Sequence, residues 1–145
     1  MGQFDFKNHS YEVSDWTDEF YLECIVQYNG HTWYFMGQLD KGLQYRQGMN
    51  LMILESGQVE EGYFYNGVQH GPWRCIYPLG GYFQGMAYEE MKHGYGTYVS
   101  YKGDQYKGYY KENVRHAEGC KIFIGSHENE IHHVKYDEGD VSETY

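Results

Sequence analysis

Basic residues, proline and cysteine are all scarce in this sequence, and each shortage excludes a class of protein. The 145 residues include 11 Lys and Arg against 21 Asp and Glu, which gives a formal net charge of −10. Because no basic stripe is present, the sequence argues against a nucleic-acid partner and disfavours an anionic membrane surface. It has no run of about 20 apolar residues, so no transmembrane helix is expected. Its first residues lack a basic segment followed by an apolar one, so no signal peptide is expected.

Cysteines and prolines are few as well. Cys24, Cys75 and Cys120 are too few and too far apart for a disulfide framework, and they are typical of reduced thiols in a cytosolic protein. Proline occurs twice, whereas glycine occurs 19 times and tyrosine 18 times. Disordered chains are poor in aromatic residues, so this composition predicts many tight turns between short, aromatic-rich strands.

Glycines recur at a spacing of 23 residues. Gly62, Gly85 and Gly108 are the anchors of this repeat, and Gly37 lies 25 residues before Gly62, so the first unit has two extra residues. Counting nine residues from each anchor aligns Arg46 with Gly71, Gly94 and Ala117. Together with the anchors, the glycines for which this period predicts a structural role are Gly57, Gly80, Gly103, Gly94 and Gly96.

Each unit is predicted to contain a strand, a turn and a second strand. Asn66-Gly67 lies between two strand candidates and is the strongest two-residue hairpin signal. Glu90 and Asn113 take the place of Gly67 in the next two units. Asn tolerates a left-handed backbone better than Glu does, so a different turn type is expected at Glu90. The anchor glycines lie inside strands, where we expect aromatic side chains from neighbouring strands to cross the bare backbone.

These columns resemble the MORN (membrane occupation and recognition nexus) repeat. The closest match extends from Phe83-Gln84-Gly85 through His93-Gly94-Tyr95-Gly96-Thr97-Tyr98 to Gly103, and the segments around Gly62 and Gly108 match less fully. The resemblance covers roughly residues 35–125. It implies an all-β fold: a single-layer solenoid of consecutive antiparallel β-hairpins, with about four to five repeats and atypical end caps.

Charge divides the chain into three parts. Residues 1–34 and 126–145 each carry a net charge of −5, whereas residues 35–125 contain 9 basic and 9 acidic residues. We therefore expect an acidic N-terminal extension with a capping hairpin over 1–34, the repeat array over 35–125, and an acidic C-terminal cap and tail over 126–145. Terminal repeats of solenoids are atypical because their outer surfaces meet water or a partner.

Catalytic and metal-binding chemistry is not expected. His70, His93 and His116 recur every 23 residues, but equivalent residues two strands apart are separated by roughly 10 Å. A zinc ion needs ligands at about 2.0–2.1 Å, so this column cannot share one metal. No local signature of a nucleophile surrounds the cysteines, and no glycine motif fits a phosphate loop. The sequence therefore predicts a protein that is not an enzyme, with no metal and no cofactor.

The surplus of aromatic residues predicts a binding surface, because aromatic side chains anchor protein interfaces. We expect a protein-interaction scaffold or assembly subunit of a larger complex, which uses an aromatic groove and its terminal hairpins. The alternatives are a phospholipid-binding module, which the charge disfavours, and a regulatory subunit of a larger enzyme. The resemblance adds an expected cytoplasmic location, with the cytoskeleton, cilium or axoneme as sites of association. Candidate partner-binding residues are Trp16, Trp33, Tyr63, Tyr65, Tyr88, Tyr95, Tyr109 and Tyr110.

Overall fold

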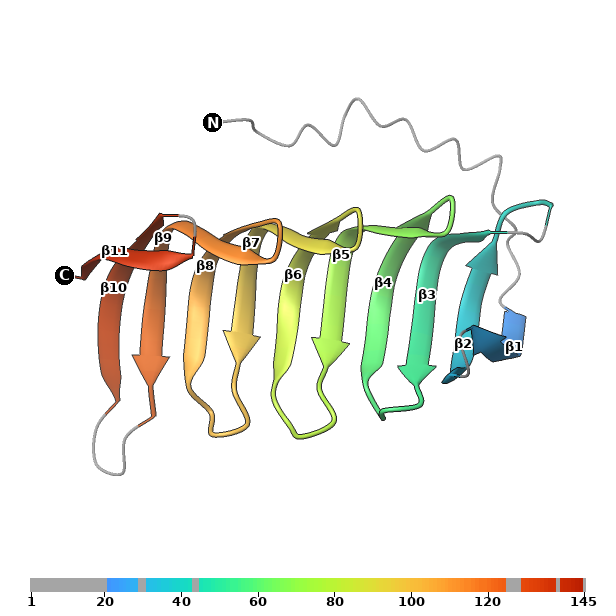
Figure 1. The fold of residues 1–145 in the computed structure, drawn as a ribbon, viewed down its shortest axis with the longest axis horizontal. Coiled ribbons are helices and arrows are strands. Elements are labelled where there is room, and N and C mark those ends of the chain that lie inside the picture. Colours follow the sequence, from blue (N-terminus) through green and yellow to red (C-terminus); the bar gives the residue numbers. More distant parts are fainter. Residues whose placement is uncertain (1–20, 29–30, 43–44, 125–128, 138, 145) are drawn as a thin grey trace.

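The computed structural model describes residues 21–28, 31–42, 45–124, 129–137 and 139–144, and this part of the chain is all-β. Eleven strands form one open sheet in which every strand pairs antiparallel with the next one in sequence (Figure 1). Within these ranges there is no helix that could span a membrane. The strands are β1 (Tyr21–Tyr28), β2 (His31–Leu39), β3 (Arg46–Leu54), β4 (Val59–Tyr65), β5 (Val68–Ile76), β6 (Tyr82–Tyr88), β7 (Met91–Val99), β8 (Gln105–Lys111), β9 (Val114–Phe123), β10 (Glu130–Asp137) and β11 (Asp140–Thr144).

The prediction of consecutive antiparallel strands is confirmed, and the backbone shows where the 23-residue period lies. Gly48, Gly71, Gly94 and Ala117 all have a positive φ, at 64°, 100°, 76° and 55°. The alignment of Arg46 with Gly71 is therefore wrong, because Gly48 is the equivalent residue. The two extra residues of the first unit lie between Gly37 and Gly48, where β2 and β3 are joined by a longer connection.

The same conformation recurs in three two-residue turns, which are Asn66-Gly67, Glu89-Glu90 and Glu112-Asn113. Asn66 and Gly67 have φ values of 49° and 81°, and the corresponding values at Glu89 and Glu90 are 49° and 65°. Positive φ at both central residues is typical of type I′ turns, whose twist matches that of the flanking strands. The expectation of a different turn at Glu90 is therefore wrong: strand pairing on both sides imposes this conformation on a residue that does not favour it.

Each hairpin also bonds to the hairpin before it. The amide of Gly67 donates to the carbonyl of Arg46 at 2.9 Å, and the amides of Glu90 and Asn113 donate to the carbonyls of Gln69 and Lys92 at 3.1 and 3.0 Å. These bonds repeat every 23 residues and hold the tip of one hairpin against the start of the preceding strand. Figure 1 shows the result, in which the upper ends of the hairpins bend away from the lower strands and overlap in series.

One surface of the sheet, here called the core face, is covered by aromatic rings that lie on glycines. Phe83 is fully buried, and a Cβ added at Gly96 would lie 2.6 Å from its ring. Tyr106 covers Gly108 and Gly119 in the same way. The glycines stand opposite each other in register, so one ring crosses two bare backbones. The anchor glycines Gly85 and Gly108 are thus covered by aromatic rings, but each ring comes from the glycine's own strand, so the expectation that it comes from a neighbouring strand is wrong.

In the second unit, other residue types occupy the ring position and one of the two glycine positions of this contact. Glu60 holds the position of Phe83 and Tyr106, and Trp73 holds the position of Gly96 and stands directly opposite Gly62. The indole of Trp73 packs on the Phe83 ring with 5.3 Å between ring centroids. A large side chain at the glycine position therefore fills the space that the missing aromatic would occupy.

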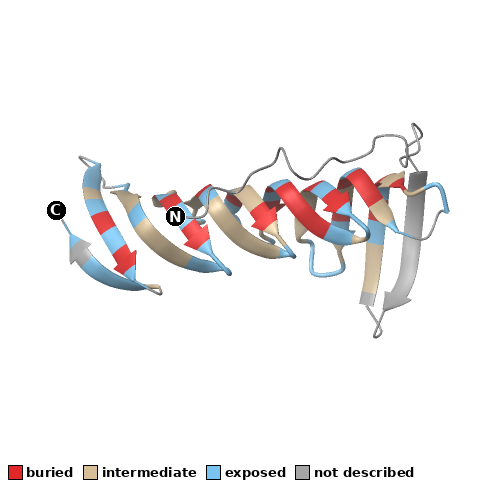
Figure 2. Cartoon of the chain, turned by 90° about the horizontal axis from the view of Figure 1, so that it is seen from above, coloured by how far each residue is buried: buried red, intermediate tan, exposed pale blue. Residues whose placement is uncertain are grey.

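Buried side chains on the core face form two clusters, and Figure 2 shows the buried positions alternating with exposed ones along the strands. Phe35, Leu39, Met52 and Phe64 form the N-terminal cluster. The C-terminal cluster contains Trp73, Cys75, Phe83, Ala87, Tyr106, Tyr110, Val134 and Tyr136. Of the buried polar side chains, Gln47 and Asn50 lie on β3 within the span of the N-terminal cluster, and Gln69 on β5 lies at the boundary between the clusters, where it bonds to Glu60 on β4. The apolar core is therefore interrupted near β4 and β5.

Candidate functional site

The opposite surface, here called the open face, has no second layer packed on it in the described part of the chain. Strand register arranges its side chains in rows that run across the strands. Met49 pairs with Tyr63, Pro72 with Met86, and Tyr95 with Tyr109. These six apolar side chains form the tip row, which lies on the side of the hairpin turns and crosses β3 to β8.

Two further rows run parallel to the tip row. The middle row is polar, and consecutive register pairs place Glu61, Arg74, Gln84, Thr97 and Lys107 in it. The base row is largely apolar and contains Ile53, Val59, Ile76, Tyr82, Val99 and Gln105. The open face therefore presents two apolar stripes with a polar stripe between them.

A groove of about 650 Å³ runs between these stripes. Its lining includes five residues of the tip row, the whole middle row, and Tyr82 and Gln105 of the base row. The main chain at Gly62, Gly85 and Gly96 also lines it, between strand neighbours whose side chains point to the open face. We call this feature the open-face groove.

The charges of the groove nearly cancel. Arg74 and Glu61 form an ion pair with Nη2 and Oε1 2.7 Å apart. Lys107 is exposed and is the other charged residue of the lining. The groove thus has a surplus of one positive charge, although the chain as a whole carries −10.

Four of the predicted partner-binding residues are exposed on the open face. Tyr95 and Tyr109 are 53% and 50% exposed and form an edge-to-face pair with centroids 5.5 Å apart. Tyr63 and Tyr65 are also exposed. The structure therefore gathers Tyr63, Tyr95 and Tyr109 in one row.

The other predicted residues lie elsewhere. Tyr88 is half-buried, and its ring lies 4.9 Å from that of His70 and 5.8 Å from that of His93. Tyr110 is only 6% exposed and belongs to the C-terminal cluster, so its side chain does not lie on a surface where a partner could contact it. Trp33 is half-buried and pairs with Leu54, which packs on the N-terminal cluster. Trp16 lies outside the described residues.

Sequence reasoning missed the non-aromatic members of the groove. Met49, Pro72 and Met86 complete the tip row, and Lys107 carries the surplus charge. Their grouping depends on cross-strand register and on the bulges at Gly71 and Gly94, which the glycine spacing alone does not define.

A series of cations on the core face was also missed. Lys92 Nζ lies 5.0 Å from the centroid of Phe83, and Arg115 Cζ lies 4.4 Å from that of Tyr106. Burial lowers the pKa of Lys92. Arg46 is placed similarly, with Cζ 4.6 Å from the centroid of Phe64. These residues are spaced at multiples of 23, so their stems and charges are part of the packing of the core face.

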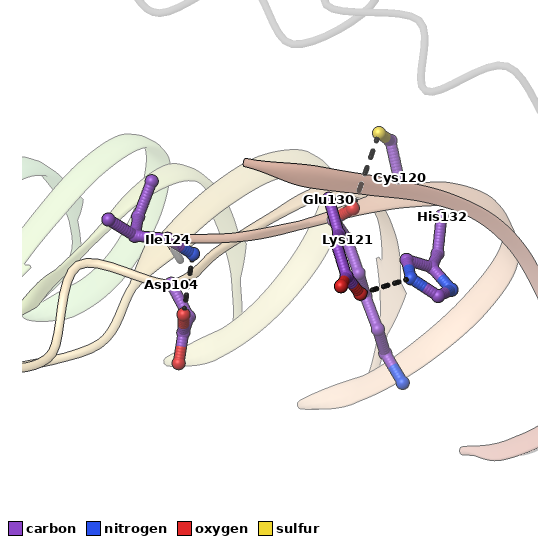
Figure 3. Close-up of polar contacts among 6 residues, drawn as sticks. All are labelled: Asp104, Cys120, Lys121, Ile124, Glu130 and His132. Atoms are coloured by element: carbon purple, nitrogen blue, oxygen red, sulfur yellow. Dashed lines mark hydrogen bonds and ion pairs between the residues drawn. The ribbon is translucent and has the colours of Figure 1, made fainter. Parts of the chain in front are cut away.

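Of the cysteines whose side chains are described, Cys75 is buried, whereas Cys120 is partly exposed and pairs across strands with His133. Cys75 is 1% exposed, and burial raises the pKa of its thiol to about 11, which disfavours the reactive thiolate. Figure 3 shows Cys120 and His132 on opposite sides of the sheet, where His132 Nε2 contacts Glu130 Oε2 at 3.3 Å. Among the described residues, no three His, Cys, Asp or Glu side chains converge in a way that could hold a metal.

Comparison with known proteins assigns no family. No protein-family model matches the chain, and no curated protein matches it. The resemblance to MORN repeats therefore stays a prediction from the residues themselves.

Proposed function

We propose that the chain is a non-catalytic protein-interaction scaffold that binds a partner along the open-face groove, as one subunit of a larger assembly. The finer description of the sheet as a MORN-type hairpin solenoid of four to five repeats belongs to the same proposal. The observation that carries it is the pair of apolar rows left exposed on a sheet that is packed on one face only. Contiguous exposed apolar surface marks interaction sites in soluble proteins.

The composition of the groove supports a protein partner over a phospholipid surface. Tyr and Met are enriched at the centres of protein interfaces, and the tip row contains three Tyr and two Met. A phospholipid headgroup would need clustered Lys or Arg, and the groove has only Lys107 besides the paired Arg74.

A pull-down from the native source tests this proposal, with wild-type chain compared with Tyr63→Ala/Tyr95→Ala. Tyr101→Ala is the matched control, because Tyr101 is 69% exposed and lies outside the groove. Proteins that wild type and the control retain should be lost from the double variant. Flotation with phosphoinositide vesicles is measured in parallel. The proposal is wrong if the chain binds the vesicles in a salt-sensitive way and the double variant loses none of the proteins that wild type retains.

A further inference from the structure

We infer that the open-face groove holds an amphipathic α-helix of the partner, laid across strands β3 to β8 with its carboxyl end over β8. This inference rests on the proposed function and specifies the structural class of the partner and its orientation. Three observations carry it: the state of the sheet backbone, the dimensions of the groove and the position of Lys107.

The sheet backbone favours a partner that satisfies its own hydrogen bonds. Strands β3 to β8 each pair on both sides, so outside the bulges their main-chain donors and acceptors are used within the sheet. A strand laid on this face would bury amide and carbonyl groups without partners, which costs free energy for each group. A helix has no such cost, because its main-chain bonds are internal.

The dimensions of the groove fit a helix. The tip and base rows are four residues apart along each strand, for example Tyr63 and Val59, which corresponds to roughly 13 Å. A helix with its side chains is about 10–12 Å wide. The tip row crosses five inter-strand gaps of about 4.8 Å, or roughly 24 Å, which is the length of about 16 helical residues.

The shape of the face argues against a second copy of the chain as the occupant. Two open faces placed together would oppose groove to groove, so each middle row would face the other across a gap. Glu61, Arg74 and Lys107 would then lose water without gaining contacts. A convex partner fills the groove without this cost.

Charge sets the direction of the helix. The Glu61–Arg74 pair neutralises the part of the groove over β4 and β5, and the surplus positive charge is Lys107 on β8. The carboxyl end of a helix carries about half a negative charge, and acidic side chains there would add to it. An amphipathic helix with carboxylates in its last turns therefore fits with its carboxyl end over Lys107.

A display library of random 16-residue peptides tests the inference. The library is selected on the immobilised wild-type chain and depleted on Tyr95→Ala. Enriched peptides should show apolar residues at i, i+3, i+4 and i+7 with Asp or Glu near the carboxyl end, and should gain helical circular dichroism on binding. Their affinity should fall about tenfold for Tyr95→Ala and change less than about twofold for Tyr101→Ala.

Charge reversal tests the direction. Lys107→Glu should weaken the selected peptides about tenfold, and a peptide whose terminal carboxylates are replaced by Lys should regain binding to that variant. Lys102→Glu is the control, since Lys102 lies outside the groove lining. Thermal melts establish that each variant is folded, which is expected because all four side chains are at least partly exposed.

The outcomes separate this inference from the proposed function. If the enriched peptides need Tyr95 but are proline-rich, or alternate polar and apolar residues, the bound segment is not a helix. The proposed scaffold function would be unaffected by that result. Helical peptides indifferent to Lys107→Glu would overturn the orientation. If no peptide is enriched over the Tyr95→Ala background, the helix inference fails, and the native pull-down then decides the scaffold separately.

Discussion

At the scale of single residues, two units of the sheet pack an aromatic ring on a pair of glycines. Phe83 occupies the space above Gly85 and Gly96, so neither glycine has room for a side chain. Gly96 has an ordinary φ, so steric contact with the ring, rather than backbone conformation, accounts for the glycine at this position.

Gly96→Ala should therefore destabilise the protein by about 2–4 kcal/mol, since the added methyl meets the Phe83 ring. The same substitution in a Phe83→Ala background should cost at least about 1 kcal/mol less, because the ring is no longer there to be displaced. Urea unfolding of the four variants measures this coupling. If Gly96→Ala lowers the free energy of unfolding equally in both backgrounds, contact with the Phe83 ring is not the cause of the destabilisation.

Much of this packing could be predicted from sequence, and one part of it was overlooked. The 23-residue spacing led to the expected contact between rings and glycines. Alternation along β8 also puts Tyr106, Gly108 and Tyr110 on one face, so the burial of Tyr110 could have been predicted from the same pattern. The places of Met49 and Met86 could not, because they depend on strand register.

At the scale of elements, the hairpin turns show that pairing overrides local preference. Glu89 and Glu90 adopt the same left-handed pair of conformations as Asn66 and Gly67. Outside glycine and asparagine, a left-handed residue costs about 1–2 kcal/mol, and here two acidic residues occupy the turn. Turn positions were predictable from the spacing, but the conformation at Glu90 was not, because it is imposed by the strands on both sides.

Replacing Glu89-Glu90 by Asn-Gly should raise the free energy of unfolding by about 1–2 kcal/mol, since Asn and Gly adopt this turn with little strain. The urea midpoint measures the change. The converse replacement of Asn66-Gly67 by Glu-Glu should lower stability by a similar amount. A midpoint that does not rise for Asn-Gly would show that the glutamate side chains make compensating contacts.

At the scale of the whole molecule, the core is divided. The N-terminal cluster lies on β2 to β4 and the C-terminal cluster on β5 to β10, and at their boundary Gln69 Nε2 on β5 donates to Glu60 Oε2 on β4 at 3.5 Å. In a repeat array, each unit contacts only its neighbours, so such an interruption weakens the coupling between the two sides.

Phe64→Ala should therefore accelerate amide hydrogen exchange in β2 to β4 and leave β7 to β9 nearly unchanged. Tyr110→Ala, at the equivalent position two units later, should do the reverse. Each substitution removes a buried aromatic worth about 3–5 kcal/mol, so the local effect is large enough to map by mass spectrometry. Uniform acceleration along the chain would show that the two clusters unfold as one unit.

The bonds from each hairpin tip to the strand before it have a consequence for biosynthesis. Every partner of a strand is its neighbour in sequence, and the amides of Gly67, Glu90 and Asn113 bond to carbonyls that precede them by 21 residues. Each new hairpin that leaves the ribosome can thus pair at once with the strand synthesised before it. Its pairing does not depend on segments distant in sequence. The array can fold from its N-terminal end as it is synthesised, and contacts between residues close in sequence form first.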